Sequence, residues 1–266
     1  MASSITPLTG SLGASVEGVD LKRALDTGTF DALQAAFLEH CVLVFRGQNL
    51  DEDAQLAFAR RWGEPVVTPM LKSLDGYPEI VPITNPGKAT ATTEVWHYDA
   101  SFAEAPPKIT MLSAKVIPHG GDTMWSNQYL AYERLSDGMK DMLSGLRAEF
   151  VGTRIGRFMG VSPDKIPPGN MHPIVRTHPE TRRKALYVGH WETATRIEGM
   201  TATESRPLLD YLYDSSYTPD NIYRHMWQVG DLLMWDNRCT MHFAVHDYGT
   251  QERVLNRVTL KGEKPV

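Results

Sequence analysis

Two residues that commonly bind metals, His97 and Asp99, are separated by one position within residues 94–102 of this 266-residue chain. If this segment is a strand, its side chains alternate between two faces, so both groups point into the same cavity. An imidazole and a carboxylate are two members of the 2-His-1-carboxylate triad, which holds Fe(II) and leaves coordination positions open. The pair therefore predicts part of a catalytic metal site.

The spacing of this pair is weak evidence by itself. With nine histidines and 32 acidic residues in the chain, a His-x-Asp/Glu match is expected about once by chance. A second match, His178 and Glu180, lies beside a polar, turn-like stretch, and its Pro179 disfavours a central strand. We interpret that second match as a solvated hairpin loop.

A third metal ligand is expected near the C-terminus, where His242 and His246 are the candidates. Their spacing of four would suggest a zinc site on a helix, but Phe243 stands where the zincin pattern requires Glu. The alternating apolar pattern around them also favours a strand over a helix. Both histidines remain candidates on these grounds.

Two arginines, Arg253 and Arg257, follow the candidate histidines. On a strand they face the same side, about 13 Å apart at a rise of roughly 3.3 Å per residue. Two guanidinium groups beside a metal are costly to bury unless anions pair with them. The arginines therefore predict two acidic ligands, a co-substrate and a substrate.

Several motifs together resemble the taurine dioxygenase/2,4-dichlorophenoxyacetate dioxygenase family of Fe(II)- and 2-oxoglutarate-dependent enzymes. They are Gly10-Ser11-Leu12-Gly13-Ala14, Gly18-Val19-Asp20-Leu21, Phe45-Arg46-Gly47-Gln48, Trp96-His97-Tyr98-Asp99, Gly120-Gly121-Asp122-Thr123, Trp235-Asp236-Asn237-Arg238, and His242 with Arg253 and Arg257. The resemblance implies that His97, Asp99 and His242 bind iron. It further implies that Thr123 and Arg253 hold the distal carboxylate of 2-oxoglutarate, and that Arg257 meets an acidic group of the substrate. His246 is then expected at the surface or behind the ligands.

The resemblance implies an oxidoreductase that uses Fe(II), the co-substrate 2-oxoglutarate and O2. Such an enzyme hydroxylates a small anionic organic substrate next to a heteroatom and gives succinate, CO2 and a cleaved product. Thr68 stands where taurine dioxygenases place a sulfonate-contacting histidine, and the loop around Lys72 resembles the aryloxypropionate-cleaving branch. We therefore expect Thr68 and Lys72 near an aryloxyalkanoate-type carboxylate, with an alkylsulfonate or alkyl sulfate as the alternative. Lys72 is equally compatible with an ordinary surface position.

The elements that would position these residues are many short strands with a few helices between them. This pattern predicts a β-sandwich or barrel flanked by helices, and the resemblance makes it a double-stranded β-helix (jelly-roll). We expect one domain over residues 1–266, with a mobile Gly- and Pro-rich loop at about 154–173. Helices are expected at 29–40, 51–62, twice within 129–145, and at 201–214, where Thr201 and Glu204 form a capping-box pattern.

The bulk composition predicts a cytoplasmic soluble protein. A formal charge of −5 argues against nucleic acid or an anionic membrane as a partner, and no apolar run is long enough to span a bilayer. No signal peptide is visible, and Cys41 and Cys239 are expected to be buried thiols. The expected partners are the small anionic substrate and further copies of the chain. Two rival hypotheses are a non-catalytic metal- or acid-binding jelly-roll sensor and a zinc hydrolase.

Overall fold

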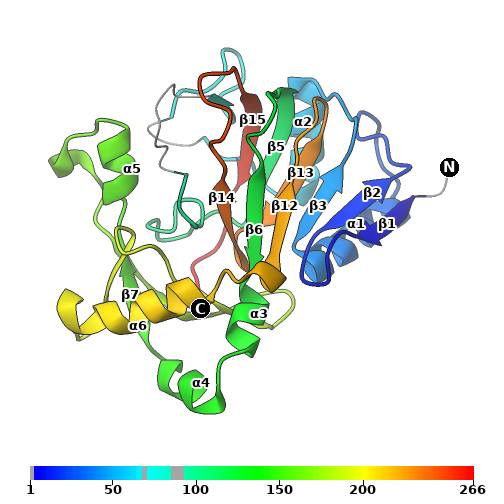
Figure 1. Ribbon diagram of the computed structural model, residues 1–266. Coiled ribbons are helices and arrows are strands. Elements are labelled where there is room, and N and C mark those ends of the chain that lie inside the picture. Colours follow the sequence, from blue (N-terminus) through cyan, green and yellow to red (C-terminus); the bar gives the residue numbers. More distant parts are fainter. Residues whose placement is uncertain (1–2, 68–70, 85–92) are drawn as a thin grey trace.

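Two β-sheets packed face to face form the centre of the protein (Figure 1). The computed structural model describes residues 3–67, 71–84 and 93–266. The larger sheet has the strand order β1-β2-β3-β13-β5-β15-β4, and the smaller one has the order β12-β6-β14. A third sheet, β11-β7-β8, and the hairpin β9-β10 lie beside these two.

The strands of the larger sheet are β1 (Ser4–Pro7), β2 (Ala14–Glu17), β3 (Val42–Phe45), β4 (Ile80–Thr84), β5 (Ile109–Val116), β13 (Leu232–Asp236) and β15 (Val254–Leu260). Those of the smaller sheet are β6 (Thr123–Asn127), β12 (Ile222–His225) and β14 (Thr240–Ala244). The remaining strands are β7 (Arg147–Phe150), β8 (Asn170–Pro173), β9 (Val175–Thr177), β10 (Lys184–Leu186) and β11 (Ala194–Ile197).

The larger sheet is buried on both faces, as strand β3 illustrates. Val42 and Val44 pack towards the smaller sheet, whereas Leu43 and Phe45 pack towards helices α1 (Thr27–His40) and α2 (Glu52–Trp62). Successive side chains of a strand point to opposite faces, so a continuous apolar run such as 42–45 fits a strand covered on both sides. The two helices therefore close one face of the sheet, and the smaller sheet closes the other.

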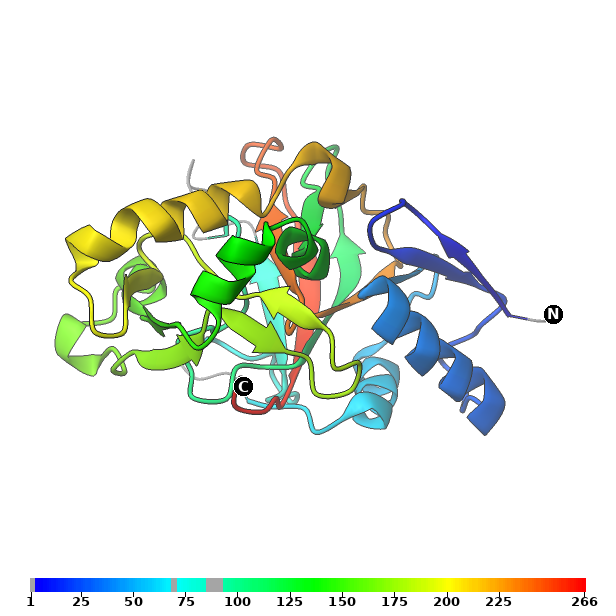
Figure 2. The ribbon, with the colours of Figure 1, turned by 90° about the horizontal axis from the view of Figure 1, so that it is seen from below.

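The other helices lie on the opposite side of the sandwich from α1 and α2 (Figures 1 and 2). They are α3 (Gln128–Glu133), α4 (Asp137–Leu143), α5 (Thr153–Phe158) and α6 (Ala202–Ser215), with short 3-10 turns at Pro163–Lys165 and Pro219–Asn221. Helix α6 begins with the predicted capping box, in which Thr201 and Glu204 bond each other's backbone N–H groups.

Most of the expected elements are present, and both cysteines are free and buried as predicted. The segment at 94–102 is not a strand, so that expectation was wrong. Its only ladder contact among the described residues is a bridge between His97 and His242. The chain then turns at Ala100, whose φ is 43°, and crosses from the smaller sheet towards β5. A segment that passes between two sheets cannot keep a ladder with either.

The His178 region forms the expected hairpin between β9 and β10, and its loop is exposed at Pro179, Glu180 and Arg182, but His178 itself is not solvated. His178 is fully buried, and its Nε2 lies 3.0 Å from Oδ2 of Asp236. Residues 154–173 include most of α5, a 3-10 turn and all of β8, whereas a loop was expected there. The mobility of this segment and the single-domain organisation stay predictions. No helix of the described part is long and apolar enough to cross a membrane.

Candidate active site

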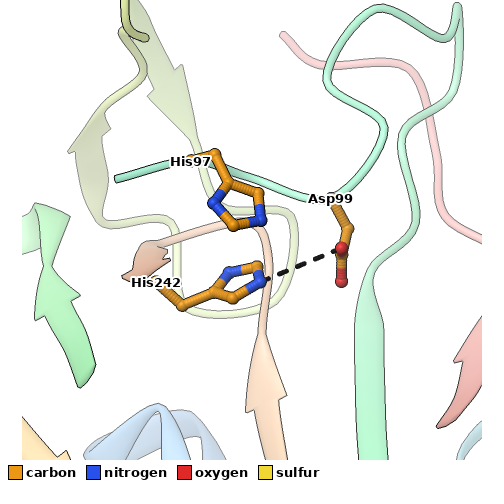
Figure 3. Close-up of side chains that lie close together, drawn as sticks. All are labelled: His97, Asp99 and His242. Atoms are coloured by element: carbon orange, nitrogen blue, oxygen red, sulfur yellow. Dashed lines mark ion pairs between the residues drawn. The ribbon is translucent and has the colours of Figure 1, made fainter. Parts of the chain in front are cut away.

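The side chains of His97, Asp99 and His242 converge at the edge of the smaller sheet (Figure 3). One potential ligand atom from each lies within 4.8 Å of the others. The two imidazole rings have their centroids 4.1 Å apart, and Nε2 of His242 is 3.9 Å from Oδ1 of Asp99. The structure thus brings together the three residues that the sequence nominated as metal ligands.

Backbone hydrogen bonds place the two histidines side by side. The N–H of His97 donates to the carbonyl of His242 at 3.0 Å, and the N–H of His242 donates back at 2.9 Å. His242 lies in β14, at the edge of the smaller sheet. A reciprocal pair of this kind fixes the distance between the two backbones, so the neighbouring rings do not depend on side-chain freedom alone.

Both imidazoles are held in the neutral form that binds metals. Burial lowers the pKa of His97, and burial together with His97 lowers the pKa of His242 to about 3. The Nδ1–H of His97 donates to the carbonyl of Val95 at 2.7 Å, which leaves its Nε2 lone pair free to bind a cation. For Asp99, burial alone would raise the pKa, but the neighbouring His242 and Arg257 bring it below the ordinary value. Two neutral nitrogens and one carboxylate oxygen are thus available.

A cavity of about 350 Å³ opens beside the three residues. His97, Asp99 and Arg257 contribute to its wall, and most of the remaining wall is apolar. The apolar and small residues are Val66, Val67, Leu71, Val95, Tyr98, Ala100, Phe102, Ala103, Ala105, Pro107, Val151, Ile155 and Met159. Arg154 of α5 also lines the cavity and is paired with Glu192. The cavity suits a molecule with an apolar body and an anionic end.

Arg257, in β15, lines the cavity next to Asp99. Its Nη1 is 3.7 Å from Oδ1 of Asp99, a separation too long for a direct hydrogen bond. Its Nε is buried and has no hydrogen-bond partner among the described residues. The guanidinium therefore retains capacity to pair with a further anion, and an orphaned donor of this kind is typical of a ligand site.

Arg253 is buried, with only 5% of its surface exposed, and its described hydrogen-bond partners are all neutral. Its Nε donates to the carbonyl of Gly121 at 3.0 Å, and its Nη2 is 3.4 Å from Oγ1 of Thr123. Within the described ranges it forms no ion pair, and burial lowers its pKa. A buried cation that forms no direct ion pair is unfavourable unless a ligand supplies a partner, so this position suits a carboxylate.

Of three further predicted positions, Lys72 and His246 lie outside the cluster and the cavity wall. Thr68 lies outside the described residues, and Lys72 is exposed and does not line the cavity, although its neighbour Leu71 does. His246 is not part of the cluster: its Nδ1 lies 2.8 Å from Glu94, and its Nε2 lies 3.2 Å from the carbonyl of Gly249. The substrate roles of Thr68 and Lys72 stay predictions.

Sequence reasoning missed residues that support the cluster from behind. Thr110 donates a hydrogen bond of 2.6 Å to Oδ2 of Asp99, and Asn237 donates one of 2.9 Å to Thr110. Thr110 carries no sequence signal, because a threonine in an apolar strand is ordinary. Asn237 belongs to the motif Trp235-Asp236-Asn237-Arg238, but its partner emerges only when β13 and β5 pair.

Comparison with known proteins gives consistent matches. The model of the family described as "Taurine catabolism dioxygenase TauD, TfdA family" matches residues 4–259. An alpha-ketoglutarate-dependent sulfate ester dioxygenase of Pseudomonas putida is 37% identical, with 98% of this chain and 90% of the relative covered. An alpha-ketoglutarate-dependent 2,4-dichlorophenoxyacetate dioxygenase of Cupriavidus pinatubonensis is 35% identical, with 95% and 96% covered.

Solved structures agree with these matches along the whole chain. A taurine dioxygenase from Burkholderia xenovorans has a TM-score of 0.88 at 34% identity, covering 100% of this chain and 93% of that one. The crystal structure of AAD-2 in complex with Mn(II) and N-oxalylglycine has a TM-score of 0.86 at 30% identity, covering 100% and 99%.

Proposed function

Because the chain belongs to the TauD, TfdA family and is thereby a 2-oxoglutarate-dependent dioxygenase, we propose that it hydroxylates a small anionic substrate at a carbon next to a heteroatom. The family resemblance and the jelly-roll fold expected from the sequence are both confirmed. The observation that carries the proposal is the cluster of His97, Asp99 and His242 at the wall of an apolar cavity.

The donor set suits Fe(II). Two neutral imidazoles and one carboxylate on one side, with open space on the other, form the facial arrangement typical of non-heme iron oxygenases. His97, Asp99 and His242 would hold the metal, and Arg253 with Thr123 would hold the distal carboxylate of 2-oxoglutarate. When bound, Fe(II) and 2-oxoglutarate supply the oxidising power to use O2, with succinate and CO2 as co-products.

The chain's own part of the reaction is orientation and exclusion of water. Arg253 supplies a buried positive charge for one end of the co-substrate, and the apolar wall formed by residues such as Phe102 and Ile155 keeps water from the reacting carbon. Arg257 supplies a cation close to the cluster for the anionic group of the substrate. A metal on Asp99 would engage that carboxylate, so Arg257 would remain available for the substrate.

The substrate that we propose is an aryloxyalkanoate-type carboxylate. An aromatic ring fits the apolar wall, the carboxylate would pair with Arg257, and the carbon between ring oxygen and carboxylate would lie nearest to the metal. Hydroxylation at that carbon gives a hemiacetal or hemiketal, which releases a phenol. The 35% identity to the 2,4-dichlorophenoxyacetate dioxygenase supports this choice.

An alkyl sulfate is the second candidate, and the 37% identity to the sulfate ester dioxygenase of Pseudomonas putida favours it. A sulfate also carries an anionic group next to an oxygen-bearing carbon, and the same cavity would take an alkyl chain. Both candidates share the chemistry of an anion joined to an apolar body through oxygen.

Succinate release by the purified protein tests the proposal. We expect succinate only when Fe(II), O2, 2-oxoglutarate and a substrate are all present. The panel should hold aryloxyacetates, aryloxypropionates and alkyl sulfates, with neutral methyl esters of the acids as matched controls. Turnover of the esters as fast as the acids would refute the anionic substrate, and metal-dependent hydrolysis without O2 would favour the zinc hydrolase instead.

A further inference from the structure

Three buried side chains, those of Trp235, Asn237 and Thr110, form a series of hydrogen bonds that ends at Asp99 of the metal-ligand cluster. Nε1 of Trp235 donates to Oδ1 of Asn237 at 2.9 Å, and Nδ2 of Asn237 donates to Oγ1 of Thr110 at 2.9 Å. The hydroxyl of Thr110 then donates to Oδ2 of Asp99 at 2.6 Å. Trp235, Asn237 and Thr110 are each at most 1% exposed, so water does not compete with these bonds.

The donor Trp235 sets the direction of this series of hydrogen bonds. An indole N–H can only donate, so the amide of Asn237 must turn its oxygen towards Trp235 and its NH2 towards Thr110. The NH2 group can only donate, so it occupies a lone pair of the Thr110 oxygen. The single hydroxyl proton of Thr110 is then directed to Asp99. Each group accepts on one side and donates on the other, and reversing any member would leave a buried donor facing a donor.

The two oxygens of Asp99 consequently face different surroundings. Oδ2 accepts the bond from Thr110, whereas Oδ1 lies 3.9 Å from Nε2 of His242 and 3.7 Å from Nη1 of Arg257. Oδ1 is therefore the oxygen on the metal side. A carboxylate that could rotate would be able to offer both oxygens to a metal and so occupy a position that the co-substrate or O2 needs.

We propose that Trp235, Asn237 and Thr110 are positioning residues whose one-way hydrogen-bond chain holds Asp99 so that Oδ1 alone is presented to the metal. The inference rests on the proposed function, since it takes Asp99 as a metal ligand. Trp235 has a second contact with the cluster, because its ring lies 4.8 Å from that of His242. Through its ring and its N–H, one residue supports two of the three ligands.

This second contact matters because the two histidines are fixed in different ways. His97 is oriented by a hydrogen bond from Nδ1 to the carbonyl of Val95. Nδ1 of His242 is buried without a partner in the described part of the chain. The ring of His242 is instead held between the rings of His97 and Trp235. Groups that orient metal ligands usually affect metal affinity or activity by about 10- to 100-fold when they are removed.

Titration of the metal-free protein with Mn2+, followed by the electron paramagnetic resonance signal of free Mn2+, tests the inference without any turnover. Thr110→Val keeps the shape of the side chain but removes the hydroxyl, and we expect it to raise the Mn2+ dissociation constant by about tenfold or more. Thr110→Ser restores the hydroxyl and should return the affinity to near the wild-type value. The melting temperature of each variant is measured in parallel.

A pair of tryptophan variants isolates the indole N–H. Trp235→Phe removes the N–H at the start of the chain. Trp125→Phe makes the same change at a fully buried neighbour whose ring lies 5.5 Å from Trp235 and whose Nε1 has no hydrogen-bond partner in the described part of the chain. Both variants lose similar packing, but Trp235→Phe also leaves the oxygen of Asn237 without its donor, so it should lose more stability. Only Trp235→Phe should weaken Mn2+ binding, by several-fold.

Three outcomes would overturn the inference. They are wild-type Mn2+ affinity in folded Thr110→Val, failure of Thr110→Ser to restore affinity, and equal Mn2+ affinities of Trp235→Phe and Trp125→Phe. If Thr110→Val does not fold, the tryptophan pair decides alone. A lower melting temperature with unchanged Mn2+ affinity would mean that these hydrogen bonds only stabilise the fold. Failure of the proposed function is distinguishable, because the wild-type protein would then bind Mn2+ yet release no succinate with any substrate.

Discussion

Replacing Arg253 by Gln should sharply weaken the binding of 2-oxoglutarate. The guanidinium is 5% exposed and donates to the carbonyl of Gly121 and to Thr123, both neutral groups. A bound carboxylate would therefore be its principal anionic partner. Removing one partner of a buried ion pair costs about 3–5 kcal/mol. Because 1.4 kcal/mol is a factor of ten, the dissociation constant should rise by about 100-fold to about 4,000-fold.

The same variant should affect the ligand-free protein in the opposite sense. An uncompensated buried cation destabilises the fold, so Arg253→Gln should keep or raise the melting temperature of the protein without 2-oxoglutarate. The dissociation constant is measured by anaerobic titration of the Fe(II)-loaded protein with 2-oxoglutarate, which separates binding from turnover. A melting curve without ligand completes the assay.

Arg224→Gln is the matched control. Arg224, like Arg253, lies near the start of β6, but its side chain is 51% exposed. Its Nε bonds Asp122 at 2.6 Å, and its Nη2 lies 3.6 Å from Asp247. Its charge is already balanced by carboxylates, so the variant should bind 2-oxoglutarate nearly as the wild type does. An unchanged dissociation constant in Arg253→Gln, or an equal loss in Arg224→Gln, would refute the assignment of the co-substrate carboxylate to Arg253.

Three further predictions follow from the same geometry. Arg257→Ala should raise the KM for the acidic substrate strongly and leave 2-oxoglutarate affinity nearly intact; unchanged substrate kinetics would contradict the pairing of Arg257 with the substrate. His242→Ala should abolish Fe(II) binding, measured by titration of the metal-free protein, whereas His246→Ala should retain it. The reverse result would mean that His246, and not His242, is the third ligand. Asp236→Asn should lower the free energy of unfolding by up to about 3–5 kcal/mol in denaturant titrations, because it removes the buried carboxylate 2.7 Å from Arg238 and leaves that guanidinium only the half-exposed Glu180, 2.6 Å away. Asp220→Asn, in an exposed pair, should change stability little. Burial alone would raise the pKa of Asp236, but Arg238 holds it well below the ordinary value. The ionised Asp236 therefore stabilises the folded state above about pH 4, and this stabilisation is lost as the pH falls further.

The sequence singled out the three residues that cluster in the structure, His97, Asp99 and His242, but not the way in which the chain positions them. His97 and Asp99 were expected to share one face of a strand, yet a single bridge to His242 and a turn at Ala100 bring them together. Motif spacing reports which side chains are present and is insensitive to the backbone between them. Local alternation cannot reveal that a segment crosses from one sheet to another, because the partner strands come from distant parts of the chain.

Burial of polar groups was the second property that the sequence did not reveal. His178 lies in a polar stretch and was expected in solvent, but Asp236 provides a partner that makes its burial favourable. Thr110 was counted only as part of an apolar strand, although its hydroxyl bonds Asp99. In both cases the partner lies far away in the sequence, so the cost of burying the group could not be judged from its neighbours. The helices and the buried strand at 42–45 were predictable because their signals are local.

The segment that carries His97 and Asp99 has few backbone hydrogen bonds to β14, so a metal held by these residues would also link two parts of the fold. Within the described part of the chain, its backbone bonds to β14 only at Thr93 and His97. A metal shared by this segment and β14 would add one more link to a segment that Trp96 and Tyr98 already anchor in the core. Binding to the folded state alone also favours that state in proportion to the free metal concentration. If Fe(II) is that metal, the iron supply would set the stability of the fold as well as the activity.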